Sequence, residues 1–451
     1  MVQSCQVYEA DGQGMIWEVS STLLKALHLQ EDRLVTLTCG SLSAQLDVVV
    51  AQSSIGTKSF MGLSGKALAA LKIPQNIYLT IKPIGPEQFR LGPVVGILTF
   101  PHVINKTQLN RYINYAEGMK KTGLLYVFRP FDIHPEIQTA EGFRYNEENK
   151  TWESGEFPYP DVVMDRMYPN DSKTHFELEK VIGPNKIFNK KTLIDKAEFN
   201  EVLEKDSYLQ NFIPETKLFL DAKDLDYYLS KYNGVFLKPV DAMRGIGIIY
   251  VTAEGNESLC RYMDGSTVVL KRIPGADYIF EILGRVNEYK RPYIIQAAVN
   301  RMEYMKRPFS FRIMTTKNDS GNWSVPIIIA KAARPGAFLT NVSSGAEYVT
   351  IKEILEWIEK QLLDENIDFI CQLTDLSLKA ATALDNEFGP LGKLGIDIVI
   401  DASGKPWLIE ANGNPGVIYI RGQKEFPDWH KQMYEHPLGY ALYLAGFSTM
   451  V

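Results

Sequence analysis

The sequence predicts a protein of mixed α/β and α+β class that is divided into several domains. Its 451 residues correspond to about three domains of ordinary size. Before residue 189, apolar strands alternate with helical segments, which is typical of a parallel α/β sheet. After that point strands outnumber helices, which favours an α+β domain that grips a ligand between two sheets. We therefore expect domains at residues 1–88, 89–188 and 189–451.

The composition is that of a folded, slightly acidic protein. Apolar residues make up 45% of the chain and charged residues 23%, both ordinary for a globular protein. The net charge of −6 argues against a nucleic-acid binder, which usually carries a basic stripe. Apolar stretches such as Val325–Ala333 are far shorter than the roughly 20 residues that span a membrane. Four scattered cysteines and an N-terminus without signal features predict a cytoplasmic protein with no membrane or nucleic-acid partner.

The first domain contains an internal repeat. Ser20–Leu37 and Ser64–Ile81 align with each other, and each copy has a serine suited to cap a short helix, a polar turn and an alternating strand. Two such halves commonly close into a small pseudo-symmetric barrel, so we expect a β-barrel-like domain. Chance similarity of two amphipathic units is the alternative.

The second domain reads as a Rossmann-like parallel sheet. Apolar runs of strand length alternate with segments whose apolar residues recur at helical spacing. A polar hairpin is expected at Gly142–Tyr159. The other expected elements are strands Val94–Phe100, Leu124–Phe128 and Asp161–Met167 and helices Gln108–Lys121 and Thr174–Val181.

The third domain begins with a helix and continues with apolar strand pairs joined by short turns. The expected helices are Lys191–Glu204, Ile351–Asp364 and Asp375–Glu387. The expected strands are Gly234–Pro239, Gly247–Val251, Thr267–Lys271, Tyr293–Ala298, Phe311–Thr316, Val325–Ala332, Gly395–Ile400 and Pro406–Glu410.

The segment Gly395–Gly416 carries the strongest chemical signal. It reads as a hairpin in which Asp397 faces inward on one strand and Glu410 and Asn412 share a face at the end of the other. Two carboxylates and an amide oxygen form the hard-oxygen site that Mg²⁺ prefers, with phosphate oxygens and water completing its shell. The alternative is that these carboxylates lie on a solvated edge.

The segment Phe236–Gly247 suits phosphate binding. Lys238 ends an apolar strand, and Gly245 and Gly247 in the following loop let backbone N–H groups approach phosphate oxygens. Arg244 lies in the same loop. The segment is not a Walker A motif, and an ordinary β-turn remains the alternative.

Three weaker signals complete the set. Lys196 stands on a predicted helix and by itself is one more surface lysine. The strand Ile294–Val299 contains Gln296 and can offer backbone groups to an adenine edge, although a plain core strand is the alternative. The basic strand end Lys331–Arg334 and the polar loop with Asn341 can stabilise a transferring phosphoryl group.

The order of these five pieces resembles the ATP-grasp superfamily over about Asn185–Gly416, and Val94–Phe188 is similar to the Rossmann-like pre-ATP-grasp domain that usually precedes it. More narrowly, the chain resembles the YheC/YheD family of endospore coat-associated ATP-grasp proteins. This narrower likeness rests on the phrases LGPVVGILTF, PDVVMDRM, FLKPV, PFSFRI, TNVSSG and GIDIVIDASGKPWLIEANGNPG.

The resemblance implies roles for individual residues. The lysines would contact nucleotide phosphates, the strand from Gln296 would form the adenine hinge, and the carboxylate group would hold Mg²⁺ and phosphate. A basic residue and a polar residue would lie beside the terminal phosphate. In that order, these residues are Lys196 and Lys238; Gln296, Ala297, Ala298 and Val299; Asp397, Glu410 and Asn412; and Arg334 and Asn341. Ser310 stands where the family tends to have a carboxylate, which puts the acceptor contact in doubt.

The expected function is an ATP- and Mg²⁺-dependent ligase that joins a carboxylate to an amine or thiol through an acyl phosphate. Its substrates would be small molecules or peptides, and spore coat proteins are expected partners. The histidines lie outside all five motifs, so no general base is evident. Two alternatives stay open: a non-catalytic ATP-binding structural protein of the spore coat, favoured by Ser310, and a nucleotide-regulated binding module.

Overall fold

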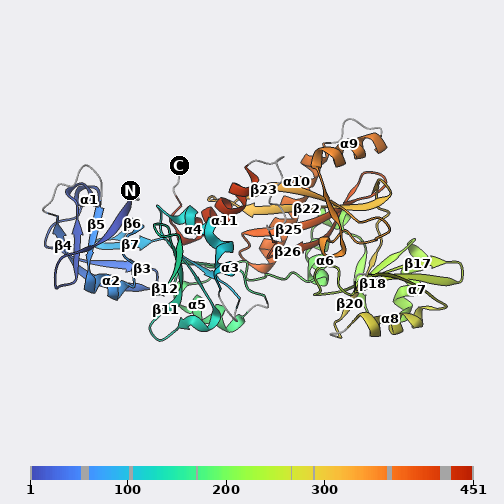
Figure 1. Cartoon of the computed structure of the whole chain (residues 1–451), viewed down its shortest axis with the longest axis horizontal. Coiled ribbons are helices and arrows are strands. Elements are labelled where there is room, and N and C mark those ends of the chain that lie inside the picture. Colours follow the sequence, from blue (N-terminus) through green and yellow to red (C-terminus); the bar gives the residue numbers. More distant parts are fainter. Residues whose placement is uncertain are drawn as a thin grey trace.

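The structure is a computed structural model, and it shows an elongated molecule with the N-terminal strands at one end (Figure 1). Mixed α/β architecture is confirmed, with several separate sheets along the chain. The structure describes residues 3–51, 60–100, 105–168, 171–265, 267–287, 290–362, 368–416 and 428–448.

The first strands form a closed barrel in the order β1-β5-β2-β4-β3-β7-β6. The two repeated segments each contain a serine-capped helix followed by strands. Ser20 accepts a hydrogen bond from the Leu23 N–H, and Ser64 accepts one from the Ala67 N–H. The elements are β1 Gln3–Ala10, β2 Ile16–Val19, α1 Ser21–Ala26, β3 Leu34–Cys39, β4 Leu42–Val50, β5 Phe60–Ser64, α2 Gly65–Leu71, β6 Ile77–Gly85 and β7 Gln88–Gly92.

The middle of the chain forms a second sheet in the order β10-β11-β9-β8-β13-β14, with β12 paired to β11. Strands β8, β9, β13 and β14 are parallel, as the sequence predicts for this region. One hydrophobic cluster contains residues of both this sheet and the barrel, so the two share a core. The strands are β8 Val94–Leu98, β9 Leu124–Phe128, β10 Ile133–His134, β11 Thr139–Asn146, β12 Thr151–Pro158, β13 Val162–Asp165 and β14 Ile187–Phe188, and helix α5 is Ser172–Ile182.

The helix predicted at Gln108–Lys121 is wrong as one continuous element. The segment forms α3 Lys106–Leu109, a 3₁₀ turn at Asn110–Tyr112 and α4 Ile113–Met119. In this arrangement the Tyr112 hydroxyl pairs with the Thr99 hydroxyl at 2.8 Å, next to the end of β8. A tertiary contact thus accompanies a break that the helical spacing did not reveal.

The third sheet has the order β15-β20-β16-β17-β18-β19 and lies at the far end of the molecule (Figure 1). Helices α7 and α8 belong to this part of the chain. The elements are β15 Thr216–Phe219, α7 Ala222–Lys231, β16 Val235–Pro239, β17 Ile249–Glu254, β18 Glu257–Asp264, β19 Thr267–Ile273, α8 Ile279–Val286 and β20 Tyr293–Ala297. We call it the lid sheet.

The fourth sheet has the order β24-β23-β22-β25-β26, and β21 pairs with β22. We call it the base sheet. Helices α6, α9 and α10 share a hydrophobic cluster with it. The elements are α6 Lys196–Glu204, β21 Glu303–Tyr304, β22 Arg307–Lys317, β23 Trp323–Ala332, β24 Glu347–Val349, α9 Ile351–Leu362, α10 Phe369–Phe388, β25 Lys393–Ile400 and β26 Pro406–Asn412. The predicted end of α9 at Asp364 lies outside the described residues.

The last helix, α11 Trp429–Ala445, was not predicted from the sequence. It contacts α4 and β13 of the middle sheet as well as β22 and β23 of the base sheet. Its two sides therefore both meet protein, so its apolar residues form no single stripe that periodicity could detect. The helix joins the middle and base sheets through one hydrophobic cluster. In the described part of the chain, no helix is long and apolar enough to cross a membrane.

Candidate functional site

A cavity of about 760 Å³, counting the part open to solvent, lies between the lid sheet and the base sheet. The predicted site residues that line it are Lys196, Lys238, Gly245, Gln296, Ala297, Val299, Asn341, Asp397 and Glu410. The predicted residues outside its lining are Gly247, Ala298, Arg334 and Asn412. The structure thus brings together residues that are far apart in sequence.

Lys196 reaches the cavity from the first position of α6. The helix begins there, and not at Lys191 as predicted, because Asp195 and Glu198 form a capping box that fixes its N-terminus. The Lys196 ammonium donates to the Ala242 carbonyl at 2.7 Å and lies 3.8 Å from the Glu410 carboxylate. Lys196 is consequently a buried residue, and the reading as a surface lysine is wrong.

Lys238 points into the cavity from β16. Its ammonium donates to the Gln296 side-chain oxygen at 2.6 Å, and Gln296 in turn donates to the Thr216 hydroxyl at 2.9 Å. Burial lowers the pKa of Lys238 to about 7, and the charge of Lys196 acts in the same direction against the opposing effect of Glu410. Burial therefore disfavours the charged form of this lysine, and an anionic ligand would restore it.

The glycine loop approaches the loop that follows β23. Gly245 has a φ of +77°, and a Cβ there would lie 3.0 Å from the Asn341 side-chain oxygen. The Ser343 hydroxyl donates to the Arg244 carbonyl at 2.9 Å, which links the same two loops. A side chain at Gly245 would thus press on the polar group that the sequence placed beside the phosphates. Gly247 lies further along, and its carbonyl accepts a hydrogen bond from Tyr293.

An aromatic wall on the lid side was missed by the sequence reasoning. Phe236 stacks on Tyr250 with ring centroids 4.7 Å apart, and Tyr250 stacks on Phe338 at 6.3 Å. Arg301 lies 5.6 Å from the Phe236 ring centroid and donates to the Phe338 carbonyl at 3.0 Å. Phe236 and Lys238 alternate on β16 and so share a face, which was the one available signal.

The expected hinge strand offers few free backbone donors. The Ala297 N–H donates to the Glu215 carbonyl and the Ala298 N–H to the Gly234 carbonyl, both at 2.9 Å. Val299 lines the cavity. In the described part of the chain its N–H donates to no backbone carbonyl. Val299 is therefore the donor of this segment that a ligand could use.

Asp397 and Glu410 lie opposite each other on β25 and β26, on the same face of the base sheet. The register shifts directly after this pair, which leaves Ile409 as an extra residue of β26 that also lines the cavity. Such a bulge re-aims side chains at the edge of a site. Both carboxylates therefore point to one face of the hairpin, which a shared metal site requires.

Asp397 is held by cations. Arg312 makes a two-point ion pair with it, with 2.6 Å between Nη2 and Oδ2, and the Lys331 ammonium lies 3.7 Å from its Oδ1. Burial opposes the charge of Asp397, but Arg312 and Lys331 outweigh it and lower the pKa to about 2. The carboxylate is consequently ionised at every physiological pH.

Asn412 and Arg334 are not among the residues that line the cavity. The Asn412 side-chain oxygen accepts the Asn414 N–H at 2.9 Å and so forms a turn at the end of β26. Arg334 follows β23 and packs near Gly345. Lys331, on β23, is the cation that reaches the carboxylates. In the sequence it stood out only as part of a basic strand end. Ser310 lies next to Lys331 in register and bonds to Thr340 at 2.8 Å.

The donor set suits a metal that also binds phosphate. Among the described residues, no group of at least three His, Cys, Asp or Glu side chains could hold a metal ion. Two paired carboxylates and a nearby amide match Mg²⁺, which usually takes few protein ligands and fills its shell with phosphate oxygens and water.

Two facing sheets enclose a cavity lined by lysines and by two carboxylates, which is the arrangement expected of an ATP-grasp protein. The chain belongs to the YheC/D-like ATP-grasp family, whose model matches residues 185–444. It is 28% identical to the endospore coat-associated protein YheD of Bacillus subtilis over 72% of this chain and 73% of that protein. It is 27% identical to the endospore coat-associated protein YheC of Bacillus subtilis over 73% of this chain and 90% of that protein.

The structure is also similar to that of the ATP-grasp ligase PsnB complexed with a minimal precursor. The identity is 13% and the TM-score 0.43, over 76% of this chain and 99% of that one.

Proposed function

We propose that this protein is an ATP- and Mg²⁺-dependent ligase that joins a carboxylate to an amine or thiol. The observation that carries the proposal is the arrangement of charge in the cavity. Lys196 and Lys238 line the same cavity as Asp397 and Glu410, together with Phe236 of the aromatic wall. A triphosphate with bound Mg²⁺ satisfies both groups, because it presents oxygens to the lysines and a cation to the carboxylates.

The nucleotide would lie in this cavity, with its phosphates near the lysines and its bound metal near the carboxylates. Its adenine edge would meet the Val299 N–H, in the segment Gln296–Val299, with Ala297 and Ala298 beside it. The α- and β-phosphates would contact Lys196, Lys238 and the backbone at Gly245 and Gly247. Phe236 would cover the apolar part of the nucleotide on the lid side.

Asp397, Glu410 and Asn412 would hold the metal. Bound Mg²⁺ would neutralise phosphate charge and polarise the transferring phosphoryl group. Arg312 and Lys331 keep Asp397 ionised, so this carboxylate needs no deprotonation before it binds a cation.

The chemistry follows two steps. A carboxylate oxygen of the first substrate attacks the γ-phosphorus of ATP, so the bond from that phosphorus to the β–γ bridging oxygen breaks and ADP leaves. The uncharged amine then attacks the carbonyl carbon, inorganic phosphate leaves with the electron pair, and the amine loses one proton to solvent. Arg334 and Asn341 would stabilise the phosphoryl oxygens. No histidine among the described residues lines the cavity, and positioning and charge would supply most of the rate.

Oxygen transfer tests this route. A carboxylate labelled with ¹⁸O should pass one labelled oxygen to the released phosphate when the protein is incubated with ATP, Mg²⁺ and panels of amino acids and peptides. Unlabelled phosphate together with ADP would show plain hydrolysis, and no ADP with any panel member would reject the ligase proposal.

The second candidate is a non-catalytic ATP-binding protein of the spore coat that has coat proteins as partners. Ser310 favours it, because a hydroxyl bonded to Thr340 replaces the carboxylate expected at that strand position. The names of the two Bacillus relatives favour the location. This protein would bind Mg·ATP without consuming it and would pull down with coat proteins from sporulating cells.

Replacing Lys238 with alanine should weaken ATP binding by about 1.5–3 kcal/mol, the range for a hydrogen bond to a charged group. Titration calorimetry at fixed Mg²⁺ measures this. Lys379→Ala is the matched control, because Lys379 lies on the exposed side of α10, far from the cavity lining, and its ion pair is with the exposed Asp375. Parent-like affinity in Lys238→Ala would place the nucleotide elsewhere.

ATP affinity should also fall as the pH rises above about 7. Burial lowers the pKa of Lys238 to about 7, whereas bound phosphate would raise it, so binding at higher pH must take up a proton. Calorimetry in two buffers of different ionisation enthalpy counts that proton. Lys238→Arg stays charged and should bind without this uptake, and uptake that persists in this variant would assign the proton to another group.

A further inference from the structure

Lys331 is a buried cation of the base sheet that lines the cavity. It is 7% exposed and lies near the end of β23. Its ammonium lies 3.7 Å from Oδ1 of Asp397, which is an ion-pair distance but too long for a hydrogen bond. Among the described residues, no group accepts a hydrogen bond from this ammonium. Because a lysine ammonium carries three N–H donors, Lys331 has donors left for a ligand.

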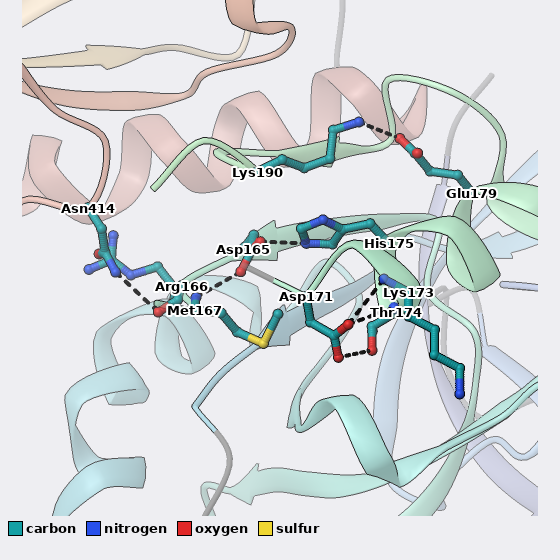
Figure 2. A network of polar contacts seen from close by, with 10 residues as sticks. All are labelled: Asp165, Arg166, Met167, Asp171, Lys173, Thr174, His175, Glu179, Lys190 and Asn414. Carbon is teal, nitrogen blue, oxygen red and sulfur yellow. Dashed lines mark hydrogen bonds and ion pairs between the residues drawn. The ribbon is translucent and has the colours of Figure 1, made fainter. Parts of the chain in front are cut away.

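Charged groups around helix α5 are satisfied within the protein, as Figure 2 shows. The buried Asp165 carboxylate contacts the His175 ring nitrogen at 2.6 Å, and the Lys190 ammonium donates to the Glu179 carboxylate at 2.7 Å. This is the usual state of buried polar groups, because an unsatisfied one costs free energy. Lys331 departs from it, and it does so where its side chain lines a cavity.

The charges around the two carboxylates leave that of Lys331 unmatched. Asp397 makes a two-point ion pair with Arg312, and the Glu410 carboxylate lies 3.8 Å from the Lys196 ammonium. Each of these pairs matches one negative charge with one positive charge. Lys331 adds a further positive charge beside the same carboxylates, and a bound metal would add more. An anion in the cavity is therefore attracted to this lysine.

Two hydroxyl groups lie beside the lysine. Ser310 lies directly opposite Lys331 on β22, so both side chains point to the same face of the base sheet. The Ser310 hydroxyl is buried and donates to the Thr340 hydroxyl at 2.8 Å. Thr340 accepts this bond and keeps its own proton for a ligand. All three residues line the cavity, so they offer an ammonium and a hydroxyl donor to one anionic group.

We propose that Lys331, Ser310 and Thr340 form an anion subsite that binds the carboxylate of the substrate to be activated. One ammonium and the hydroxyls match a singly charged carboxylate, whose oxygens only accept hydrogen bonds. The subsite adjoins Asp397, where a carboxylate must lie to reach a phosphoryl group held by the metal. The identity of the occupant rests on the proposed function, whereas the subsite itself does not.

Ser310 has a specific part in this subsite. A carboxylate at position 310 would lie opposite Lys331 and neutralise it from within the protein. The serine hydroxyl carries no charge, so it leaves the lysine to a ligand. A terminal phosphate of the nucleotide presents the same anionic oxygens as a substrate carboxylate, and the experiment below distinguishes the two.

Binding of acetate, succinate and N-acetylglycine to the full chain tests the subsite. Saturation-transfer NMR measures their affinities with saturating Mg²⁺ and a non-hydrolysable ATP analogue, so that the triphosphate site is already filled. Lys331→Met should weaken carboxylate binding about tenfold or more, because it removes a hydrogen bond between charged groups. Thr340→Val keeps the shape but loses the donor, and should weaken it about fivefold.

Variants of Ser310 separate charge from shape. Ser310→Asp should abolish binding of the three carboxylates, because the new side chain pairs with Lys331. Ser310→Asn has nearly the same size without the charge and should retain most of the parent affinity. Lys190→Met is the outer control, because it removes the same charge from a partly buried ion pair with Glu179, outside the cavity lining (Figure 2). It should bind the carboxylates like the parent.

A comparison of nucleotides identifies the occupant. If Lys331 binds the substrate carboxylate, Lys331→Met should change the affinities for ADP and for the ATP analogue by the same factor. A loss of affinity for the ATP analogue alone, with carboxylate binding unchanged, would assign the subsite to the terminal phosphate and overturn the proposal.

The proposal is also wrong if the parent binds none of the three carboxylates, or if Lys331→Met and Ser310→Asp bind them as the parent does. These measurements need no turnover, so they separate the subsite from the reaction. Oxygen transfer from a labelled carboxylate in a protein that fails this test would keep the ligase function and remove the subsite. Carboxylate binding that depends on Lys331 in a protein that releases no ADP would keep the subsite and reject the ligase function.

Discussion

Replacing Arg312 with methionine is expected to lower the free energy of unfolding by about 3 kcal/mol, because it removes the main partner of a buried carboxylate. Asp397 is 8% exposed and pairs with Arg312 through both carboxylate oxygens. Lys331 remains 3.7 Å away in the variant and compensates in part. Urea denaturation gives the overall change, and hydrogen exchange of the β22 and β25 amides assigns it to the base sheet.

Two further variants control this experiment. The double variant Arg312→Met with Asp397→Asn removes both charges and should recover most of the lost free energy. Arg272→Met breaks an ion pair with Glu254 whose two side chains are exposed, and should change stability by less than about 1 kcal/mol. A loss below that figure in Arg312→Met itself would show that the pair contributes no more than a surface contact.

The effect of Arg312→Met should disappear in acid. The pKa of Asp397 is lowered to about 2 in the folded protein, against an ordinary value of about 4. A carboxylate with a lowered pKa contributes stability above its unfolded pKa and loses it as the pH falls through the folded value. Parent and variant should therefore differ fully above about pH 4 and converge toward pH 2.

Local patterns were sufficient to predict the multi-sheet α/β architecture and several elements. Strand β9 has the bounds expected from its apolar run, and Ser20 and Ser64 cap the two helices of the repeat. Membership of the YheC/YheD family is confirmed by the match over residues 185–444. These features depend on neighbours in sequence, where periodicity and capping residues act directly.

The parts that failed depend on contacts between distant segments. Helix α11 carries apolar residues on both sides because it packs between the middle and base sheets, so it lacks a one-sided stripe. The aromatic wall joins Phe236 to Phe338, about a hundred residues later in the chain. Lys331 reaches Asp397 because β23, β22 and β25 are adjacent, and no spacing rule in the sequence distinguishes it from Arg334.

The second prediction with a large expected effect concerns Glu410, the carboxylate of the pair that Arg312 does not bind. Replacing Glu410 with glutamine should reduce Mg²⁺-dependent ATP consumption about 100-fold, which corresponds to about 3 kcal/mol of lost transition-state stabilisation. Glu410 lies opposite Asp397 on the cavity face, and the Lys196 ammonium lies 3.8 Å from its carboxylate. Of the two carboxylates it is therefore the one with more freedom to bind a metal.

The measurement pairs turnover with metal binding. Electron paramagnetic resonance of Mn²⁺ with a non-hydrolysable ATP analogue should show weaker metal binding in Glu410→Gln. The thermal midpoint should fall by less than in Arg312→Met, because Lys196 keeps its hydrogen bond to the Ala242 carbonyl. Glu387→Gln is the matched control, because Glu387 on α10 makes an exposed ion pair with Lys205. Parent-like Mn²⁺ binding in Glu410→Gln would remove this residue from the metal site, and Asp397 with Asn412 would then be the only predicted ligands left.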